Sequence, residues 1–251
     1  MKVHAAFMDP KQPSEPINSK ELKQCNKAVV LVDVFRSSAT IVEALDNGAE
    51  YVLPCSSIKE AEIIRKEFGG KNQKILLSGE KMGVMPKGFD LNISPLDVKK
   101  SVVEGKIIVY CSTNLTRILN DCKFAKTILV GGITNAHAIA RYLKNSGIEN
   151  VVLVACGTVG MITLEDVVGV GAIVECLSNE DLTDGAMLAL MVFQNPRWKK
   201  LLYEGWTAKH LQKIGFGKDL QYCIRENISG TVPILKGRHI VSAIRQFDDD
   251  Q

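Results

Sequence analysis

Apolar, β-branched runs alternate along this chain with patterns that are typical of helices. Five of these runs end in glycines and small polar residues, and a helix pattern starts directly afterwards. The five are Ala28–Val34, Ile75–Leu77, Ile107–Tyr110, Thr127–Val130 and Val151–Ala155. Continuous apolar runs of this length are typical of strands that are buried on both faces. The alternation from Ala28 to about Leu177 therefore predicts an α/β fold of β-α units around a largely parallel sheet.

The last third of the chain has a different pattern. It is helical from Ser178 to about Glu226, and the short run Val232–Leu235 predicts a closing edge strand. A chain of 251 residues fits one α/β domain over 1–251. We expect residues 178–228 to form a helical segment with one of two roles, either a cap over a site or an interface between subunits.

Local signals mark where several helices begin. Ser37 or Ser38 is expected to cap one helix, and Ser94-Pro95 is a start signal with proline at the first helical position. Asn135 is expected to cap a third helix and Thr163 a fourth. Each of these helices would return the chain to the start of the next strand.

Composition narrows the function classes. The chain is 46% hydrophobic and 24% charged, with a net charge of +3 from scattered Lys and Arg, which disfavours disorder and a nucleic-acid partner and favours a small anionic ligand. It has no apolar run of about 18 residues, and it does not start like a signal peptide. Seven cysteines without C-x-x-C spacing predict free thiols. We expect a cytoplasmic protein.

The first candidate cluster is Asp33-Val34-Phe35-Arg36-Ser37-Ser38, where a predicted strand meets a helix. In open α/β sheets ligands bind at the carboxyl ends of the strands, and a helix N-terminus attracts anions. Arg36 would add a bidentate donor for phosphate, and Asp33 would hold a metal ion. The alternative is that Asp33 and Arg36 pair with each other while Ser37 caps the helix.

Two further clusters also follow predicted strands. Glu80 and Asp90 lie in a glycine-rich loop that would bring carboxylates close to a bound ion, unless it is an ordinary solvent loop. Hydroxyl and amide donors gather in Ser112-Thr113-Asn114-Leu115-Thr116-Arg117, a pattern that favours an oxyanion cradle. In the alternative interpretation Ser112 or Thr113 only caps a helix and Arg117 lies on the surface.

Adjacent acids at Glu165 and Asp166 favour a hard cation such as Mg²⁺. Asp166 also completes a capping box with Thr163, which leaves Glu165 as the better ligand candidate. The four histidines lack metal-type spacing, and we expect structural or exposed positions for them; they are His4, His137, His210 and His239.

Several common phosphate-handling motifs are missing from the sequence. It has neither a G-x-x-x-x-G-K-[ST] loop nor a G-x-G-x-x-G turn after a strand, so an enzyme acting on a nucleotide lacks support. Phosphatases with a strand-end aspartate nucleophile need a second acid two residues later, where this chain has Phe35. These classes are therefore disfavoured.

Taken in order, the clusters resemble the 2-phosphosulfolactate phosphatase family from about Val29 to Val241. The resemblance rests on Asp33–Thr40, Ala44, Asn47-Gly48-Ala49, Gly79-Glu80, Gly88-Phe89-Asp90, Ser94-Pro95, Ser112-Thr113-Asn114, Thr116-Arg117, Asn135-Ala136, Gly157, Leu164-Glu165-Asp166, Gly171-Ala172, Asp184, Gly215-Phe216, Asp219-Leu220, Val232-Pro233 and Gly237. It implies a three-layer α/β/α fold and a Mg²⁺-dependent hydrolysis of 2-phospho-3-sulfolactate to 3-sulfolactate and phosphate, a step of coenzyme M biosynthesis.

The resemblance and the clusters together lead to one hypothesis for the site. Catalysis is assigned to Asp33, Arg36 and Glu80, and metal binding to Asp33, Glu80, Asp90, Glu165 and Asp166. Substrate binding is assigned to Ser37, Ser38, Ser112, Thr113, Asn114, Thr116, Arg117, Asn135 and Gly157. Whether water or a carboxylate such as Asp33 attacks the phosphorus stays open, as does assembly into a homo-oligomer.

The chain departs from the family pattern at three places. Leu115 replaces a glycine, Asn92-Ile93 replaces Gly-Asn, and Met161 lies in a stretch that is usually polar. We expect these residues to make the rim of the site more apolar. Two alternatives follow, namely a phosphatase for a different ester and a non-catalytic anion-binding or regulatory protein on the same fold.

Overall fold

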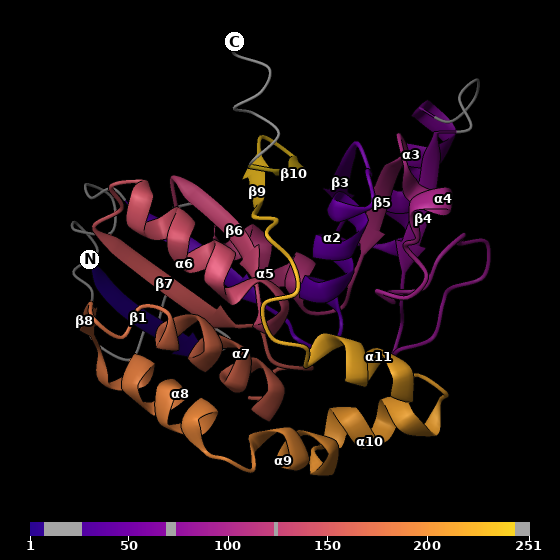
Figure 1. The fold of residues 1–251 in the computed structure, drawn as a ribbon. Helices are drawn as coiled ribbons and strands as arrows, with labels where there is room; N and C mark the ends of the chain where they lie inside the picture. Colours follow the sequence, from indigo (N-terminus) through magenta and orange to yellow (C-terminus); the bar gives the residue numbers. More distant parts are fainter. Residues whose placement is uncertain (8–26, 69–73, 123–124, 244–251) are drawn as a thin grey trace.

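The computed structural model describes residues 1–7, 27–68, 74–122 and 125–243, and its centre is one mixed sheet of ten strands (Figure 1). Across the sheet the strands follow the order β4-β5-β3-β10-β9-β6-β2-β7-β1-β8. Their bounds are β1 Lys2–Phe7, β2 Lys27–Val32, β3 Tyr51–Pro54, β4 Ile75–Gly79, β5 Ile107–Cys111, β6 Thr127–Gly131, β7 Asn150–Ala155, β8 Asp181–Leu182, β9 Pro233–Lys236 and β10 His239–Ser242.

Most neighbouring strands run parallel, as the sequence predicts. The antiparallel pairs all involve the hairpin of β9 and β10, which inserts between β3 and β6. The prediction of an edge strand at Val232–Leu235 is therefore wrong. Pro233 is tolerated inside the sheet because it is the first residue of β9, and β9 pairs with β6 only at Ile234 and Leu129.

Helices cover both faces of the sheet, so the three-layer α/β/α architecture is confirmed. Strand β2 shows why: Val30 and Val32 pack with the α6 and α7 side, while Val29 and Leu31 pack with the α2 and α5 side. Both faces bury apolar side chains, which explains the continuous apolar run. The helices of these layers are α2 Ser37–Asp46, α3 Ile58–Phe68, α4 Lys100–Val103, α5 Leu115–Asp121, α6 Ala136–Asn145 and α7 Leu164–Glu175, with a 3₁₀ turn at Ile133–Asn135.

The helical C-terminal segment forms four helices, α8 Asp184–Gln194, α9 Trp198–Glu204, α10 Trp206–Lys213 and α11 Gly217–Cys223. They follow one another along the lower edge of Figure 1, from α8 beside α7 to α11 near α2. The helical pattern predicted for this part of the chain is therefore confirmed. Its path along the sheet could not be foreseen from local periodicity.

Several local predictions need correction. Strands β1 and β3 are absent from the five predicted runs, because β1 precedes the first alternation and β3 has only four residues. Residues 94–97 form a turn rather than a helix start, and α4 begins only at Lys100. The Ser94 hydroxyl accepts from the Leu96 N–H at 3.2 Å inside this turn and donates to Asp219 at 3.0 Å.

The structure bears on two further predictions from the sequence, which concern membrane spans and free thiols. Within the described residues, no helix combines the length and apolarity that a membrane crossing needs. Six cysteines are free thiols, five of them buried and Cys176 partly exposed, while Cys25 lies outside the described residues.

Candidate active site

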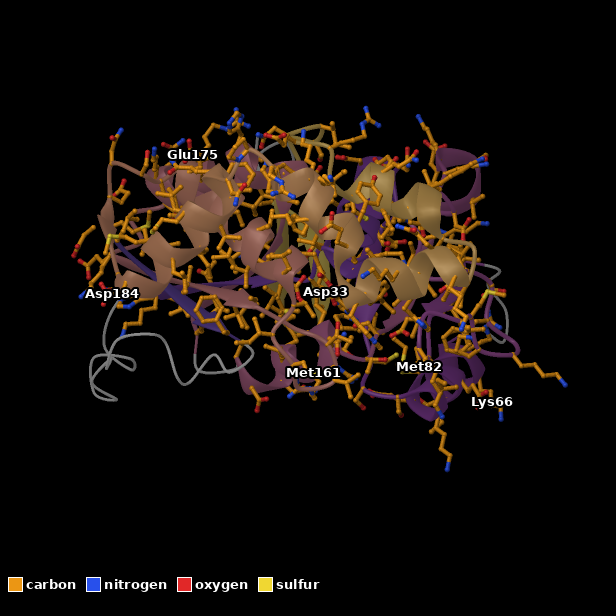
Figure 2. The ribbon with its side chains drawn as sticks, turned by 90° about the horizontal axis from the view of Figure 1, so that it is seen from below. Asp33, Lys66, Met82, Met161, Glu175 and Asp184 are labelled. Atoms are coloured by element: carbon orange, nitrogen blue, oxygen red, sulfur yellow. The ribbon has the colours of Figure 1, made fainter. Side chains whose placement is uncertain are left out.

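The carboxyl ends of four strands and one face of α10 enclose a cavity of about 560 Å³, including its open mouth. Figure 2 looks onto this end of the sheet, with Asp33 near the centre of the view, Met161 below it and Met82 below it and to the right. The lining residues are Asp33, Phe35, Arg36, Ser37, Glu80, Met82, Gly83, Ile93, Ser112, Thr113, Asn114, Thr158, Val159, Trp206, Thr207, His210 and Leu211. The cavity is at the edge of the sheet where the sequence places the chemistry.

Asp33 lies directly after β2 and is only 5% exposed. The Ser37 hydroxyl donates to its Oδ2 at 2.7 Å, and its own backbone N–H donates to Ser38 Oγ at 3.0 Å. Ser37 and Ser38 are the first two residues of α2. Neither caps the helix, because their hydroxyls bond with Asp33 instead. Ser37 lines the cavity, whereas Ser38 lies behind it.

Burial raises the pKa of Asp33 to about 6, and the Ser37 hydroxyl opposes the rise while the charges of Glu80 and Glu165 add to it. Burial also raises the pKa of Glu165, and a hydrogen bond with the Thr207 side chain of α10 lowers it in part. The charges of Glu80 and Glu165 therefore both act on Asp33, although Glu165 itself does not line the cavity. Such a cluster is stabilised by a nearby positive charge.

Arg36 does not pair with Asp33, so that alternative is wrong. Its Nη1 donates to Asp219 Oδ2 of α11 at 2.8 Å, and its Nη2 donates to the Gly83 carbonyl at 3.1 Å. The guanidinium also lies over the Phe216 ring, 4.1 Å from the ring centre. Arg36 is 3% exposed and reaches the edge of the cavity, but much of its donor capacity is already used by these groups.

Glu80 joins the loops that follow β4 and β5. Its Oε1 accepts from the Thr113 N–H at 3.0 Å and from the Thr113 hydroxyl at 2.7 Å, and its Oε2 accepts from the Gly83 N–H at 2.7 Å. Ser112 and Asn114 line the cavity beside them, and Asn114 Oδ1 accepts from the Val159 N–H at 3.2 Å. Only Ser112, Thr113 and Asn114 of the predicted cradle thus line the cavity, and the Ser112 hydroxyl accepts from the Thr116 N–H of α5 at 3.3 Å.

Asp166 has a different role from the capping box that Thr163 predicts. Its Oδ1 accepts from the Val34 N–H at 2.7 Å and its Oδ2 from the Gly157 N–H at 2.8 Å, and Thr163 makes no capping hydrogen bond to α7. Asp166 therefore ties the loops after β2 and β7 together. Burial, with the charges of Asp33 and Glu165, raises the pKa of Asp166 well above its usual value.

Eight predicted site residues lie away from the cavity lining; besides Ser38, Glu165 and Asp166 they are the five described next. Asp90 is exposed, forms an ion pair with Arg65 and accepts from the Leu77 N–H at 2.8 Å. Asn135 is fully buried, holds Gly132 N–H and the carbonyls of β6 and Thr231, and makes no capping bond to α6. The other three are Thr116, whose hydroxyl donates to Ser112 O, Arg117, which is exposed, and Gly157, which is held by Asp166.

The structure brings in residues for which the sequence predicts no role in the site, among them His210, which was expected at a structural or exposed position. Trp206, Thr207, His210 and Leu211 reach the cavity from one face of α10, and Asp219 holds Arg36 from α11. Their spacing of one, three and four residues is a helix-face signal, but nothing local indicates that this face looks onto Asp33. Tyr110 lies behind the site. Burial, with the charges of Asp33 and Glu80, raises the pKa of its hydroxyl well above the usual value.

The three departures from the family pattern have different positions. Leu115 is fully buried in the core between α5 and the sheet, so the expectation that it makes the rim apolar is wrong. Ile93 does line the cavity, and Met161 is about half exposed in the neighbouring loop. The apolar side chains at the cavity come mainly from Phe35, Met82, Ile93, Val159, Trp206 and Leu211.

Comparison with known proteins gives a consistent result. The family model described as 2-phosphosulpholactate phosphatase matches residues 14–238. A protein of Carboxydothermus hydrogenoformans named "Probable 2-phosphosulfolactate phosphatase" is 36% identical over 228 residues, which cover 88% of this chain and 93% of that protein. This chain is also similar to proteins of the same name from two other organisms. It is 39% identical to the one from Thermotoga petrophila, with 84% of this chain and 90% of that protein covered. It is 36% identical to the one from Clostridium perfringens, with 84% of this chain and 86% of that protein covered.

Proposed function

This chain belongs to the 2-phosphosulfolactate phosphatase family of phosphoric monoester hydrolases, and we propose that it hydrolyses 2-phospho-3-sulfolactate to 3-sulfolactate and phosphate with the help of Mg²⁺. This would be a step of coenzyme M biosynthesis in the cytoplasm.

The observation that carries the proposal is the buried Asp33 at the carboxyl end of β2, in one cavity with Glu80 and the Ser112–Asn114 turn. Spontaneous hydrolysis of phosphomonoesters is extremely slow, so a phosphatase has to neutralise the charge of the phosphoryl group. Hydroxyl and amide donors and an acid that holds a cation are the groups that do this. This cavity presents both kinds of group.

The acids around the cavity fit a Mg²⁺ ion that is shared with the substrate. In the described part of the chain no three metal-ligating side chains meet in a ready-made ion site. Mg²⁺ usually keeps several waters and takes one or two carboxylates together with substrate phosphates, so such a site is not required. Asp33 would be the main ligand. Burial raises its pKa, and the negative charges of Glu80 and Glu165 add to the rise. A cation would balance these negative charges. When bound, the ion would supply positive charge to the phosphoryl oxygens.

The chain's own residues have distinct tasks in this proposal. Ser37 keeps the Asp33 carboxylate oriented, because its hydroxyl donates to Oδ2 at 2.7 Å. Glu80 fixes the Thr113 N–H and hydroxyl, which shapes the turn that would receive the phosphate. Arg36 adds positive charge at the edge of the cavity, reduced by its buried ion pair with Asp219.

We also propose that residues 178–228 act as a cap rather than as a subunit interface. The Arg36–Asp219 ion pair attaches α11 to the Asp33 turn, and the Thr207 side chain acts on Glu165 from α10. Both contacts join the helical segment to the acids of the site.

A phosphatase for a different ester is the second candidate, because six apolar side chains line the cavity. One experiment separates the two candidates: phosphate release from a panel of phosphorylated small acids and neutral alkyl phosphates, with Mg²⁺ and with a chelator. Selective, Mg²⁺-dependent release from 2-phospho-3-sulfolactate is expected. Release only from other esters would mean that the substrate is a different phosphate ester. Release that persists with chelator would mean that the reaction does not depend on Mg²⁺.

A further inference from the structure

His210 reaches the cavity from α10 and is held there by two contacts that the proposed reaction does not explain. Its Nε2 lies 3.0 Å from the carbonyl oxygen of Met82, in the loop after β4. Its ring stacks on Trp206, with the ring centres 5.6 Å apart and the planes 6° apart. The side chain is thus fixed at both its edge and its face.

The contact with Met82 determines which ring nitrogen carries a proton. A carbonyl oxygen can only accept, so Nε2 must be the donor, and it is protonated in either charge state of the ring. Nδ1 is then the nitrogen that gains or loses a proton. In the described residues, no hydrogen-bond partner of Nδ1 is found.

The cavity needs a proton donor that is not already assigned. When a phosphomonoester of an alcohol is cleaved, the ester oxygen leaves as an alkoxide, a poor leaving group unless it is protonated. Asp33 is the main candidate for the metal, Glu80 is held by Thr113 and Gly83, and Arg36 does not give up its proton. Among the described residues that line the cavity, His210 is the remaining side chain suited to proton transfer.

We propose that His210 is the general acid that protonates the leaving oxygen, an inference that rests on the proposed function. As the bond between phosphorus and the ester oxygen breaks, its electron pair stays on that oxygen, which takes the proton from Nδ1 of the imidazolium. The proton released when water is consumed restores the imidazolium. The products are the free alcohol and inorganic phosphate, and Met82 O holds the ring in position throughout.

The decisive variant is His210→Gln, because the glutamine amide N–H can still donate to Met82 O but carries no proton for the leaving group. It is assayed with Mg²⁺ on two substrates, 2-phospho-3-sulfolactate with its alkoxide leaving group and p-nitrophenyl phosphate, whose leaving group needs no proton. The matched control is His239→Gln. The His239 ring lies against that of Tyr51, tilted by 37°, at the start of β3 and so at the opposite edge of the sheet.

For the alkyl ester kcat should fall about 10²- to 10⁴-fold, while for p-nitrophenyl phosphate it should change less than about threefold. Equal losses on both substrates, or wild-type activity on both, would overturn the role of His210 and leave the proposed function intact. If the wild type releases phosphate from neither ester, the proposed function and this inference fall together. A circular dichroism spectrum and melting curve of the variant confirm that it is folded.

Discussion

Replacing Asp33 with asparagine should make the metal-free protein more stable while it abolishes Mg²⁺-dependent turnover. Asp33 is buried beside Glu80 and Glu165, and burial raises its pKa from 3.8 to about 6. The folded state then binds its proton more tightly than the unfolded state does. Between these two pKa values the folded protein carries more protons, so its stability falls as the pH rises.

The magnitude follows from the pKa rise. Each pKa unit corresponds to about 1.4 kcal/mol, so a rise of roughly two units costs the metal-free folded state about 3 kcal/mol once Asp33 is ionised. The cost is absent below about pH 4 and complete above about pH 6. Asparagine carries no charge, and its amide oxygen can still accept from Ser37. Asp33→Asn should therefore be about 3 kcal/mol more stable than the wild type at about pH 7, with no difference at about pH 4.

Urea unfolding in the presence of a chelator, followed by circular dichroism at both pH values, measures this difference. Asp184→Asn, a substitution of an exposed acid at the start of α8, is the matched control and should show no gain. A variant that is less stable than the wild type at neutral pH would refute the reasoning. An equally large gain at low pH would refute it too, because the gain would then not come from the charge. Phosphate release with Mg²⁺ should be lost in this variant and kept in the control.

Three other substitutions test the contacts around the site. Asp219→Asn leaves the buried Arg36 charge without its partner and should cost about 3–5 kcal/mol in urea unfolding; a cost below about 1 kcal/mol would mean that the ion pair contributes little. Tyr110→Phe removes a buried hydroxyl that has no hydrogen-bond partner in the described residues, so the melting temperature should stay equal or rise, and a clear drop would reveal a missed partner. Asp166→Asn leaves one of two backbone N–H groups, of Val34 or Gly157, without an acceptor and should destabilise the protein by about 1–3 kcal/mol, whereas unchanged unfolding would contradict the bridging role.

The apolar periodicity of the chain is sufficient to predict the parallel sheet and the location of the site. Strand β2 is apolar at every position after Lys27 because both of its faces are covered, and Asp33 is the first charged residue after it. Since parallel strands end at the same edge of a sheet, Asp33, Glu80 and the Ser112–Asn114 turn could be placed together from the sequence alone.

The partners of these residues could not be predicted, because they come from parts of the chain that are distant in sequence. Arg36 pairs with Asp219, which is 183 residues away, and the Val34 N–H donates to Asp166, which is 132 residues away. Local patterns instead suggested a nearby partner in both cases, a pair with Asp33 and a capping box with Thr163.

The same limit applies to α10 and to Leu115. Helical periodicity shows which side chains of α10 share a face, but not that this face covers the acids of the site. Leu115 stands where the family pattern has a glycine, which suggested a change at the rim of the site. The first turn of α5 instead directs this side chain into the core. Local sequence sets element type and the edge at which loops gather, since both depend on nearest neighbours along the chain. Which side chains meet there depends on the packing of whole elements against one another, and that exists only in the folded protein.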